Sequence, residues 1–291
     1  MNLLRLSDMV QWVHIRCIYM IDTCMGYWQN NMIHTWGIAS GKSAGNEKEN
    51  MIMTRGEGAC LVCGEPLIYF EEAKELECQI CHKTFHAYSS CKNGHYVCDQ
   101  CHEKKGIQVI LDGCRQSSSK NPIAIMQQLM EDPYIYMHGP EHHILVGAAL
   151  LTACHNCGAA MDFPAALEEM KERGSRYPGG SCGLWGCCGA AVSVGMFISI
   201  FTKATPLTGK SWGCANQATA RALAAIGALG GPRCCKRNSF TAVKEAAAFV
   251  KETFGIEMEL PDAIRCDFSH ENQQCLKTRC PYYQGASETF V

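Results

Sequence analysis

The chain has 291 residues with a formal net charge of −2, and 47% of its residues are hydrophobic. This composition suffices for a folded core, and a near-neutral charge without basic blocks argues against a nucleic-acid partner. The 21 cysteines are far more than usual, yet the chain is too long for a disulfide-stapled mini-domain and shows no cleavable signal peptide. We therefore expect a cytoplasmic metal-binding protein.

The first 50 residues do not resemble the rest of the chain. Apolar and polar residues mix there without a sustained period, and residues 37–50 are rich in glycine, serine and charge, as linkers are. We expect residues 1–50 to be a disordered or spurious extension, with Met51 or Met53 as the natural start. Its cysteines, Cys17 and Cys24, are assigned no role.

Residues 51–112 contain the strongest metal-binding pattern. Three C-x2-C pairs lie between residues 60 and 101, and a histidine and a further cysteine separate the second pair from the third. Each pair places two thiolates on one tight turn, which is how proteins hold tetrahedral zinc. The eight candidate ligands, enough for one or two Zn²⁺ ions, are Cys60, Cys63, Cys78, Cys81, His86, Cys91, Cys98 and Cys101.

The order of these ligands is similar to that of cross-braced treble-clef domains such as PHD fingers, and we expect a small treble-clef or ribbon-like module. Interleaved pairing gives one site from Cys60, Cys63, His86 and Cys91 and another from Cys78, Cys81, Cys98 and Cys101. Sequential pairing is an open alternative, and His82, His95 and His102 are competing ligands. We expect the zinc to be structural, because a catalytic zinc needs an open coordination position.

Residues 121–291 are predicted to form an all-helical, cysteine-rich domain. Asn121 followed by proline, and Asp162 two residues before another proline, are typical helix starts. Between these two helices the pattern predicts a third helix, which is apolar.

Titratable side chains gather at the start of this apolar helix. They are His138, Glu141, His142 and His143. Imidazoles and a carboxylate so close together are candidates for moving protons or binding a metal, and capping or surface roles are the alternative. The helix ends in a C-x2-C pair, Cys154 and Cys157, for which we expect a metal-ligand or structural role because no βαβ pattern surrounds it.

Cysteines also stand at the start of three helices predicted between residues 179 and 249. They are Cys182, Cys187 and Cys188 at the first, Cys214 at the second, and Cys234 and Cys235 at the third. A helix N-terminus favours the thiolate form of a cysteine. Because the intervening turns would let antiparallel helices return their ends to one region, we expect one thiolate-lined site.

The first of these helices follows a long uncharged segment. No charged residue occurs between Arg176 and Lys203. That length matches a membrane span, but proline and four glycines interrupt its first part, so we expect a buried core helix and no membrane insertion.

The C-terminal residues carry a fourth cluster of ligand types. It consists of Cys266, His270, Cys275 and Cys280, and proline follows the last cysteine directly. A Cys-Pro step resembles the end of several iron–sulfur ligand runs, and a separate zinc site is the alternative.

Two turns in the second half of the chain carry a resemblance to a known family. Residues 179–182, GGSC, lead into an alanine-rich helix, and residues 232–238, PRCCKRN, lead into TAVKEAAAF. These turns and their separation resemble the α-domain of iron–sulfur L-serine dehydratases and the related L-cysteine desulfidases. The chain also resembles, as a whole, an uncharacterised cysteine-rich prokaryotic family with an N-terminal zinc-binding region.

The resemblance implies an all-helical domain with a [4Fe–4S] cluster on three cysteines, whose open iron polarises a substrate hydroxyl or thiol during β-elimination. Cys182 matches the first ligand, and Cys235 or Cys234 the last. The middle ligand of the family lies in a CDP turn, where this chain has Ala224-Ala225-Ile226, so Cys214, Cys187 or Cys188 would have to replace it.

These observations predict an iron–sulfur-dependent lyase or desulfurase acting on a small hydroxy or thiol compound. Its polar groups would come from Asn216, Gln217, Arg237 and Asn238, with His138, Glu141 and His142 as acid or base. One alternative is a non-enzymatic zinc protein whose module binds another protein. Another is a thiol or persulfide carrier that uses Cys187-Cys188 or Cys234-Cys235, since vicinal cysteines make poor structural disulfides.

Overall fold

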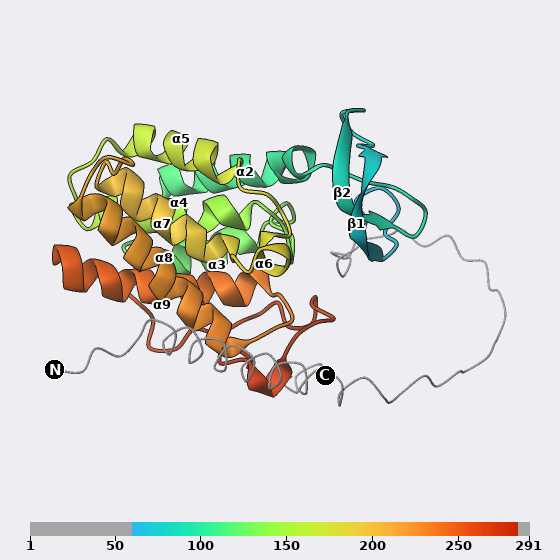
Figure 1. Ribbon diagram of the computed structural model, residues 1–291. Helices are drawn as coiled ribbons and strands as arrows, with labels where there is room; N and C mark the ends of the chain where they lie inside the picture. Colours follow the sequence, from blue (N-terminus) through green and yellow to red (C-terminus); the bar gives the residue numbers. More distant parts are fainter. Residues whose placement is uncertain (1–59, 285–291) are drawn as a thin grey trace, which may run out of the picture. The chain divides into compact units, whose positions relative to one another are not determined.

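The computed structural model describes residues 60–284, so the extension predicted for residues 1–50 lies outside the described residues. A two-stranded sheet precedes eight α-helices in this part of the chain (Figure 1). The fold is therefore mostly helical, and a small cysteine-rich hairpin module precedes the helices, as predicted. The elements are β1 (Leu67–Glu77), β2 (Thr84–Cys91), α2 (Asp99–Gln116), α3 (Pro122–Met130), α4 (His142–Asn156), α5 (Phe163–Gly174), α6 (Ser181–Leu184), α7 (Gly189–Phe201), α8 (Lys210–Leu229), α9 (Cys235–Phe254) and the 3-10 turn η1 (Lys277–Arg279).

The hairpin of β1 and β2 has almost no core of its own. The strands pair antiparallel, from Leu67 opposite Cys91 to Glu77 opposite Thr84, with an irregularity between Tyr69 and Lys74. All side chains of β1 are exposed or half-buried. A hairpin that buries so little apolar surface is not stable in water by itself, so it depends on interactions beyond its own strand pairing.

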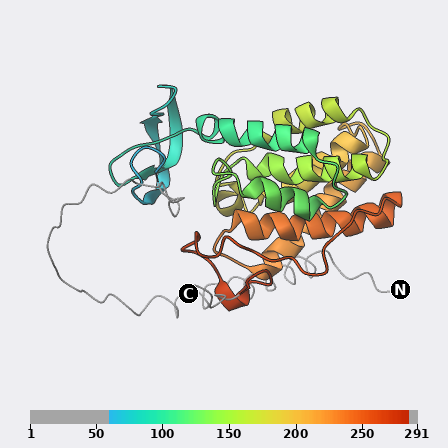
Figure 2. The same cartoon turned by 180° about the vertical axis from the view of Figure 1, so that it is seen from behind.

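Helix α4 is the centre of the helical domain. It packs against α2, α3, α5, α7 and α9, and its residues from Ile144 to Cys154 are buried on every side. A helix that is apolar all round is stable only when other helices cover it. Seen from behind, α4 lies between α2 and α9 (Figure 2).

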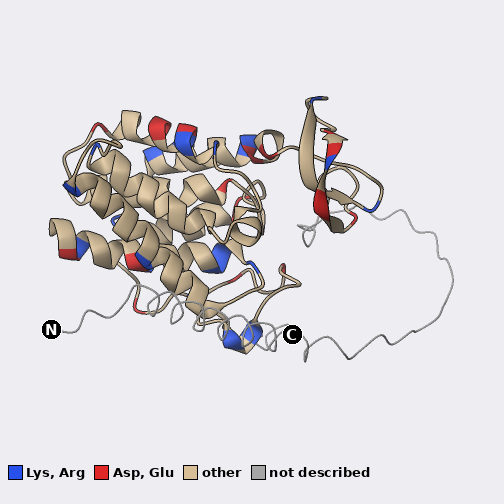
Figure 3. Ribbon diagram, in the orientation of Figure 1, with Lys and Arg blue, Asp and Glu red and all other residues tan. Residues whose placement is uncertain are grey.

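Helix α7 is the uncharged helix predicted from the sequence. Figure 3 shows no Lys, Arg, Asp or Glu on it, and Val194, Phe197 and Ile198 are completely buried. It packs against α4, α5, α8 and α9, which confirms the prediction of a buried core helix. No helix within residues 60–284 is long and apolar enough to cross a membrane.

The two helix starts predicted from capping residues are present. Oδ1 of Asn121 accepts hydrogen bonds from the backbone N–H groups of Ile123 and Ala124, both at 3.0 Å. Oδ1 of Asp162 accepts one from Ala165 at 3.2 Å. Each cap satisfies amide groups that the first helical turn leaves without partners, and proline follows in the first turn of each helix.

Helices α7, α8 and α9 run alternately up and down, and this order decides where their N-termini lie. Gly195, in the middle of α7, lies against Ala215 and Thr219 of α8, so closely that a Cβ atom there would meet Oγ1 of Thr219 at 1.9 Å. Arg221 of α8 in turn binds Glu245 of α9 at 2.8 Å. The N-termini of α7 and α9 therefore share one end of the domain, and the N-terminus of α8 lies at the other.

Candidate metal centres

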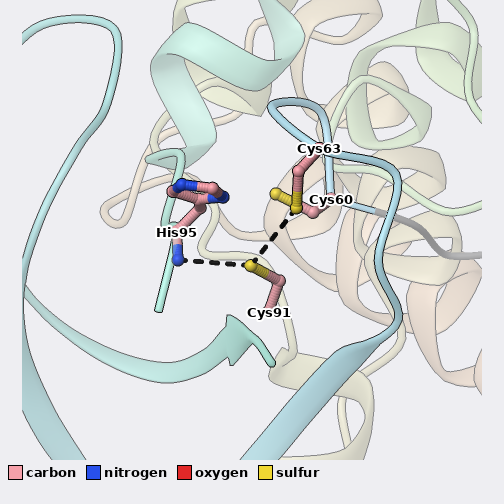
Figure 4. A group of neighbouring side chains, drawn as sticks. All are labelled: Cys60, Cys63, Cys91 and His95. Atoms are coloured by element: carbon pink, nitrogen blue, oxygen red, sulfur yellow. Dashed lines mark hydrogen bonds between the residues drawn. The ribbon is translucent and has the colours of Figure 1, made fainter. Parts of the chain in front are cut away.

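The first candidate metal centre consists of three cysteines and a histidine at the open end of the hairpin, where Leu67 pairs with Cys91. The side-chain ligand atoms of Cys60, Cys63, Cys91 and His95 all lie within 4.8 Å of one another (Figure 4). Cys60 and Cys63 precede β1, Cys91 ends β2, and His95 follows in the next turn. The sulfur atoms of Cys63 and Cys91 are 3.8 Å apart.

The second metal centre joins the β1–β2 loop to the start of α2. The sulfur atoms of Cys78, Cys81, Cys98 and Cys101 also lie within 4.8 Å of one another, and those of Cys81 and Cys98 are 3.8 Å apart. Two thiolates bound tetrahedrally at Zn–S distances of about 2.3 Å are about 3.8 Å apart. Both groups therefore have the spacing of one tetrahedral ion each.

Backbone N–H groups point at the sulfur atoms of both centres. Cys98 donates to Sγ of Cys78 at 3.4 Å, and His95 donates to Sγ of Cys91 at 3.2 Å. Burial raises the pKa of Cys78, but such N–H contacts outweigh it and lower that pKa to about 6. Thiolates stabilised in this way are ready to bind a metal, because only the deprotonated form is a ligand.

The two centres are interleaved along the chain. The structure therefore adopts the cross-braced pairing and not the sequential pairing. One predicted ligand differs: His95 takes the place expected for His86. His86 lies within β2, where alternate side chains point to opposite faces, and its side chain is 76% exposed. The sequence signal that could have identified His95 as the ligand is its C-x3-H spacing from Cys91, which places the imidazole in the turn after β2.

The six cysteines at the starts of α7, α8 and α9 do not come together. Asn238 of α9 donates to Sγ of Cys188 at 3.4 Å, so the starts of α7 and α9 do meet. Cys214 lies at the opposite end of the domain, because α8 runs antiparallel to both neighbours. Cys182 and Cys187 belong to α6 and the turn after it, and Cys235 follows Cys234 into α9.

The cysteines of the C-terminal segment instead converge on Cys234. Cys234, Cys266, Cys275 and Cys280 line one cavity. His270, predicted beside them, is exposed.

The C-x2-C pair at the end of α4 belongs to neither metal centre. Sγ of Cys154 lies 3.8 Å from the sulfur of Met258 in the core, and Sγ of Cys157 lies 3.4 Å from the carbonyl oxygen of Glu257. Burial raises the pKa of Cys154 to about 12. Of the two expected roles, packing of the segment after α9 against α4 is the one these contacts support.

Glu141 forms a buried polar cluster with two histidines. Its side chain is fully buried, and neither carboxylate oxygen has a hydrogen-bond partner among the described residues. Oε1 lies 3.4 Å from Nδ1 of His142, and Oε2 lies 3.8 Å from Nδ1 of His102. A Cβ atom at Gly139 would meet Oε2 of Glu141 at 2.0 Å, so any larger residue there would displace the carboxylate from this position.

Two further groups beside this cluster have strongly shifted pKa values. Burial, with the charge of Arg233, lowers the pKa of His138 to about 3. Burial, with the charges of Asp99 and Glu141, raises the pKa of Glu103 to about 8. The sequence did not indicate Glu103, because a glutamate in the first turns of a helix is usually exposed.

The four polar residues predicted to meet a substrate divide into two pairs. Arg237 and Asn238 are buried in the first turns of α9, where Nε of Arg237 donates to Oδ1 of Asn238 at 3.2 Å. Asn216 and Gln217 are exposed on α8. The structure thus keeps the first pair near Cys188 and Cys234, and separates the second pair from them.

Comparison with known proteins adds one assignment. Residues 110–283 match a family of unknown function (DUF5714), which is more than half of the chain. The chain belongs to this family. No curated protein and no solved structure matches. The match to DUF5714 covers the helical domain with Glu141, Cys234 and the C-terminal cysteines, and it begins after the last ligand of the two metal centres.

Proposed function

We propose that this DUF5714 protein is a metalloenzyme whose helical domain performs an iron–sulfur-dependent elimination or desulfuration of a small hydroxy or thiol compound. The two interleaved centres would hold structural Zn²⁺, since each offers four protein ligands and no open position. The observation that carries the enzymatic part is the buried cluster around Glu141.

A carboxylate buried without hydrogen bonds is costly, and such groups concentrate at functional sites. Glu141 lies between two imidazoles, which are the side chains best suited to exchange protons near neutral pH. His138 connects this cluster to the cysteine-lined cavity, because its imidazole interacts with His142 on one side and with Asn272, a wall residue of the cavity, on the other. Acid–base groups and thiols therefore lie side by side.

This arrangement suits β-elimination. A base such as Glu141 takes the proton from the carbon next to the substrate carboxylate, and the electron pair forms a carbon–carbon double bond. The C–O or C–S bond at the next carbon breaks, and the leaving group takes a proton from an acid of the cluster to depart as water or hydrogen sulfide. The carboxyl group of Glu103, whose pKa is raised to about 8, is protonated near neutral pH and would be that acid. When bound, an iron–sulfur cluster with an accessible iron supplies Lewis acidity toward that leaving group. Arg237, as a buried cation, would bind the substrate carboxylate.

The test is anaerobic turnover with L-cysteine and L-serine as probes, followed as release of sulfide or ammonia. We expect Glu141→Gln, which keeps the shape of the side chain, to lower turnover about 100-fold or more. Glu168→Gln on the exposed face of α5 is the matched control and should leave turnover unchanged. Equal turnover in wild type and Glu141→Gln, or none in the metal-loaded wild type with either probe, would contradict the proposal.

Exposed apolar residues on the metal-binding module favour a second candidate function, in which the module binds another protein. Ile68, Tyr69, Ile80 and Tyr88 are each 42–56% exposed. Large apolar side chains that stay exposed on so small a module are candidates for an interaction site. If this is the function, Ile80→Ser with Tyr88→Ser should abolish capture of the partner while both Zn²⁺ ions stay bound.

We do not propose the persulfide-carrier alternative. Burial raises the pKa of Cys188 and of Cys234, and it raises that of Cys235 to about 12. These thiols are therefore protonated near neutral pH, and the thiolate is the nucleophilic form.

A further inference from the structure

The cavity lined by Cys234, Cys266, Cys275 and Cys280 is the third place where thiols gather. It is lined by residues of the start of α9 and of the C-terminal segment that follows Ile264. Apart from the thiols, its wall includes apolar side chains such as Phe268, Leu276 and Tyr282. Such a wall excludes water from whatever the thiols bind.

The fold fixes these four cysteines from both sides. Cys234 is the N-cap of α9, and its sulfur accepts a hydrogen bond from the N–H of Arg237 at 3.4 Å. The backbone of Cys266 donates to the carbonyl oxygen of Tyr282 at 2.8 Å, which closes the C-terminal segment into a loop. Cys275 and Cys280 lie in successive turns of that loop. The hydroxyl of Tyr282 lies 3.0 Å from that of Thr241 and attaches the loop to α9.

The spacing of the sulfur atoms differs from that of the two metal centres. Within residues 60–284, only those two centres have four ligand atoms all within 4.8 Å of one another. The four sulfurs of the cavity lack this close spacing, but they are neighbours because all four cysteines line the same cavity. This spacing does not fit one Zn²⁺ ion, but four cysteines around one cavity suit a polynuclear iron–sulfur cluster.

The charges around the cavity also suit an anionic group. Arg237 lines it, and the buried Lys236 lies 4.5 Å above the ring centre of Phe268, another wall residue. A cluster bound by thiolates carries net negative charge, and buried cations beside it compensate that charge.

Hydrogen-bond donors lie in the wall. Asn272 is 3% exposed and lines the cavity, and its side-chain amide lies beside the imidazole of His138. Cluster sulfurs accept hydrogen bonds from such donors, and the backbone of Lys277 already donates to Sγ of Cys275 at 3.4 Å.

We propose that Cys234, Cys266, Cys275 and Cys280 hold one [4Fe–4S] cluster in this cavity. The proline directly after Cys280 agrees with the Cys-Pro step of known [4Fe–4S] ligand runs. This set shares Cys234 with the ligands implied by the dehydratase resemblance and replaces the others. Because four thiolates leave no iron open, the elimination proposed above requires substrate to displace one of them.

The experiment is anaerobic reconstitution of the full chain with ferrous iron and sulfide, followed by iron and sulfide analysis, visible absorbance and electron paramagnetic resonance after reduction. We expect about four iron and four sulfide per chain. Cys266→Ser and Cys280→Ser should each lose most of the cluster. Cys182→Ser and Cys214→Ser are matched controls, partly buried and buried, and should retain it.

Alkylation of the unmutated chain tests the same ligands without relying on the folding of variants. In the loaded protein Cys234, Cys266, Cys275 and Cys280 should be protected, and removal of the cluster should make them reactive. The inference is overturned if the chain takes up no iron and sulfide, if the control variants lose the cluster and the cavity variants keep it, or if the four cysteines react equally in both states. A protein that holds the cluster without turning over either probe would contradict only the proposed reaction.

Discussion

Cysteines are used in opposite ways in the metal-binding module and in the helical domain. In the module, sulfur atoms 3.8 Å apart lie on a hairpin whose strand β1 has no buried side chain. In the helical domain, four cysteines line one cavity within a packed core. The spacing of the sulfurs, more than their number, therefore indicates which metal group each region suits. The difference also predicts which region needs its metal in order to fold.

Removing zinc should have the largest effect, and only the module should show it. Structural zinc contributes about 10–16 kcal/mol in small zinc-dependent folds, whereas the helical domain has its own apolar core. We expect a strong zinc chelator to abolish the hydrogen-exchange protection of amides in β1 and β2 and to leave that of α4 and α7 unchanged. Loss of protection in all four elements, or in none, would break the comparison.

Replacing a single ligand should sharpen the assignment within the module. His95→Ala should lose about one of the two Zn²⁺ ions, because a tetrahedral site with three ligands binds zinc much more weakly. His86→Ala is the matched control, since its exposed side chain belongs to neither centre. Zinc analysis after dialysis checks both variants, and the reverse pattern would restore His86 as the ligand.

Removing a large buried side chain from the helical core should destabilise the helical domain and leave the metal-binding module unchanged. Phe197 of α7 is fully buried, so Phe197→Ala should lower the free energy of unfolding of the helical domain by about 3–5 kcal/mol. Chemical denaturation followed by far-ultraviolet circular dichroism measures this change. Zinc content should stay at the wild-type level. If zinc were lost together with helical stability, the two regions would not be independent.

The smallest expected effect is a dependence of helical stability on pH. Burial lowers the pKa of His143 in the folded state, although the carbonyl oxygen of Tyr177 opposes this shift. In the unfolded chain a histidine has a pKa of about 6.5. The unfolded state thus binds more protons below that pH, and the contribution of neutral His143 to stability is lost as the pH falls.

His143→Gln removes this titration. The melting temperature of the variant should fall less than that of the wild type between pH 8 and pH 5.5. Identical slopes would show that His143 does not titrate differently on unfolding. Because both proteins carry the same zinc ligands, any loss of zinc at low pH cancels in the comparison.

The module could be predicted from the sequence almost completely. Each C-x2-C pair folds as a local turn, so spacing alone identifies seven of the eight ligands found in the two centres. The histidine was harder, because His86 and His95 are both near Cys91 in sequence. Only the course of β2, which turns His86 toward solvent, distinguishes them.

For the helical domain, the sequence predicted the positions of the helices but not which cysteines come together. Capping residues located α3 and α5, and the absence of charge identified α7 as buried. The expected meeting of three helix starts was wrong for Cys214, because consecutive antiparallel helices bring only alternate starts together. The cavity escaped prediction because Cys234 and Cys280 are 46 residues apart, and no local pattern indicates that the C-terminal loop returns to α9.

We propose that the metal-binding module holds two single ions and that the helical domain holds a cluster. The most direct test of this contrast is metal and sulfide analysis of the full chain purified without oxygen. We predict two zinc per chain from the two interleaved centres, together with about four iron and four sulfide from the cavity. A chain that contains three zinc ions and neither iron nor sulfide would contradict this account.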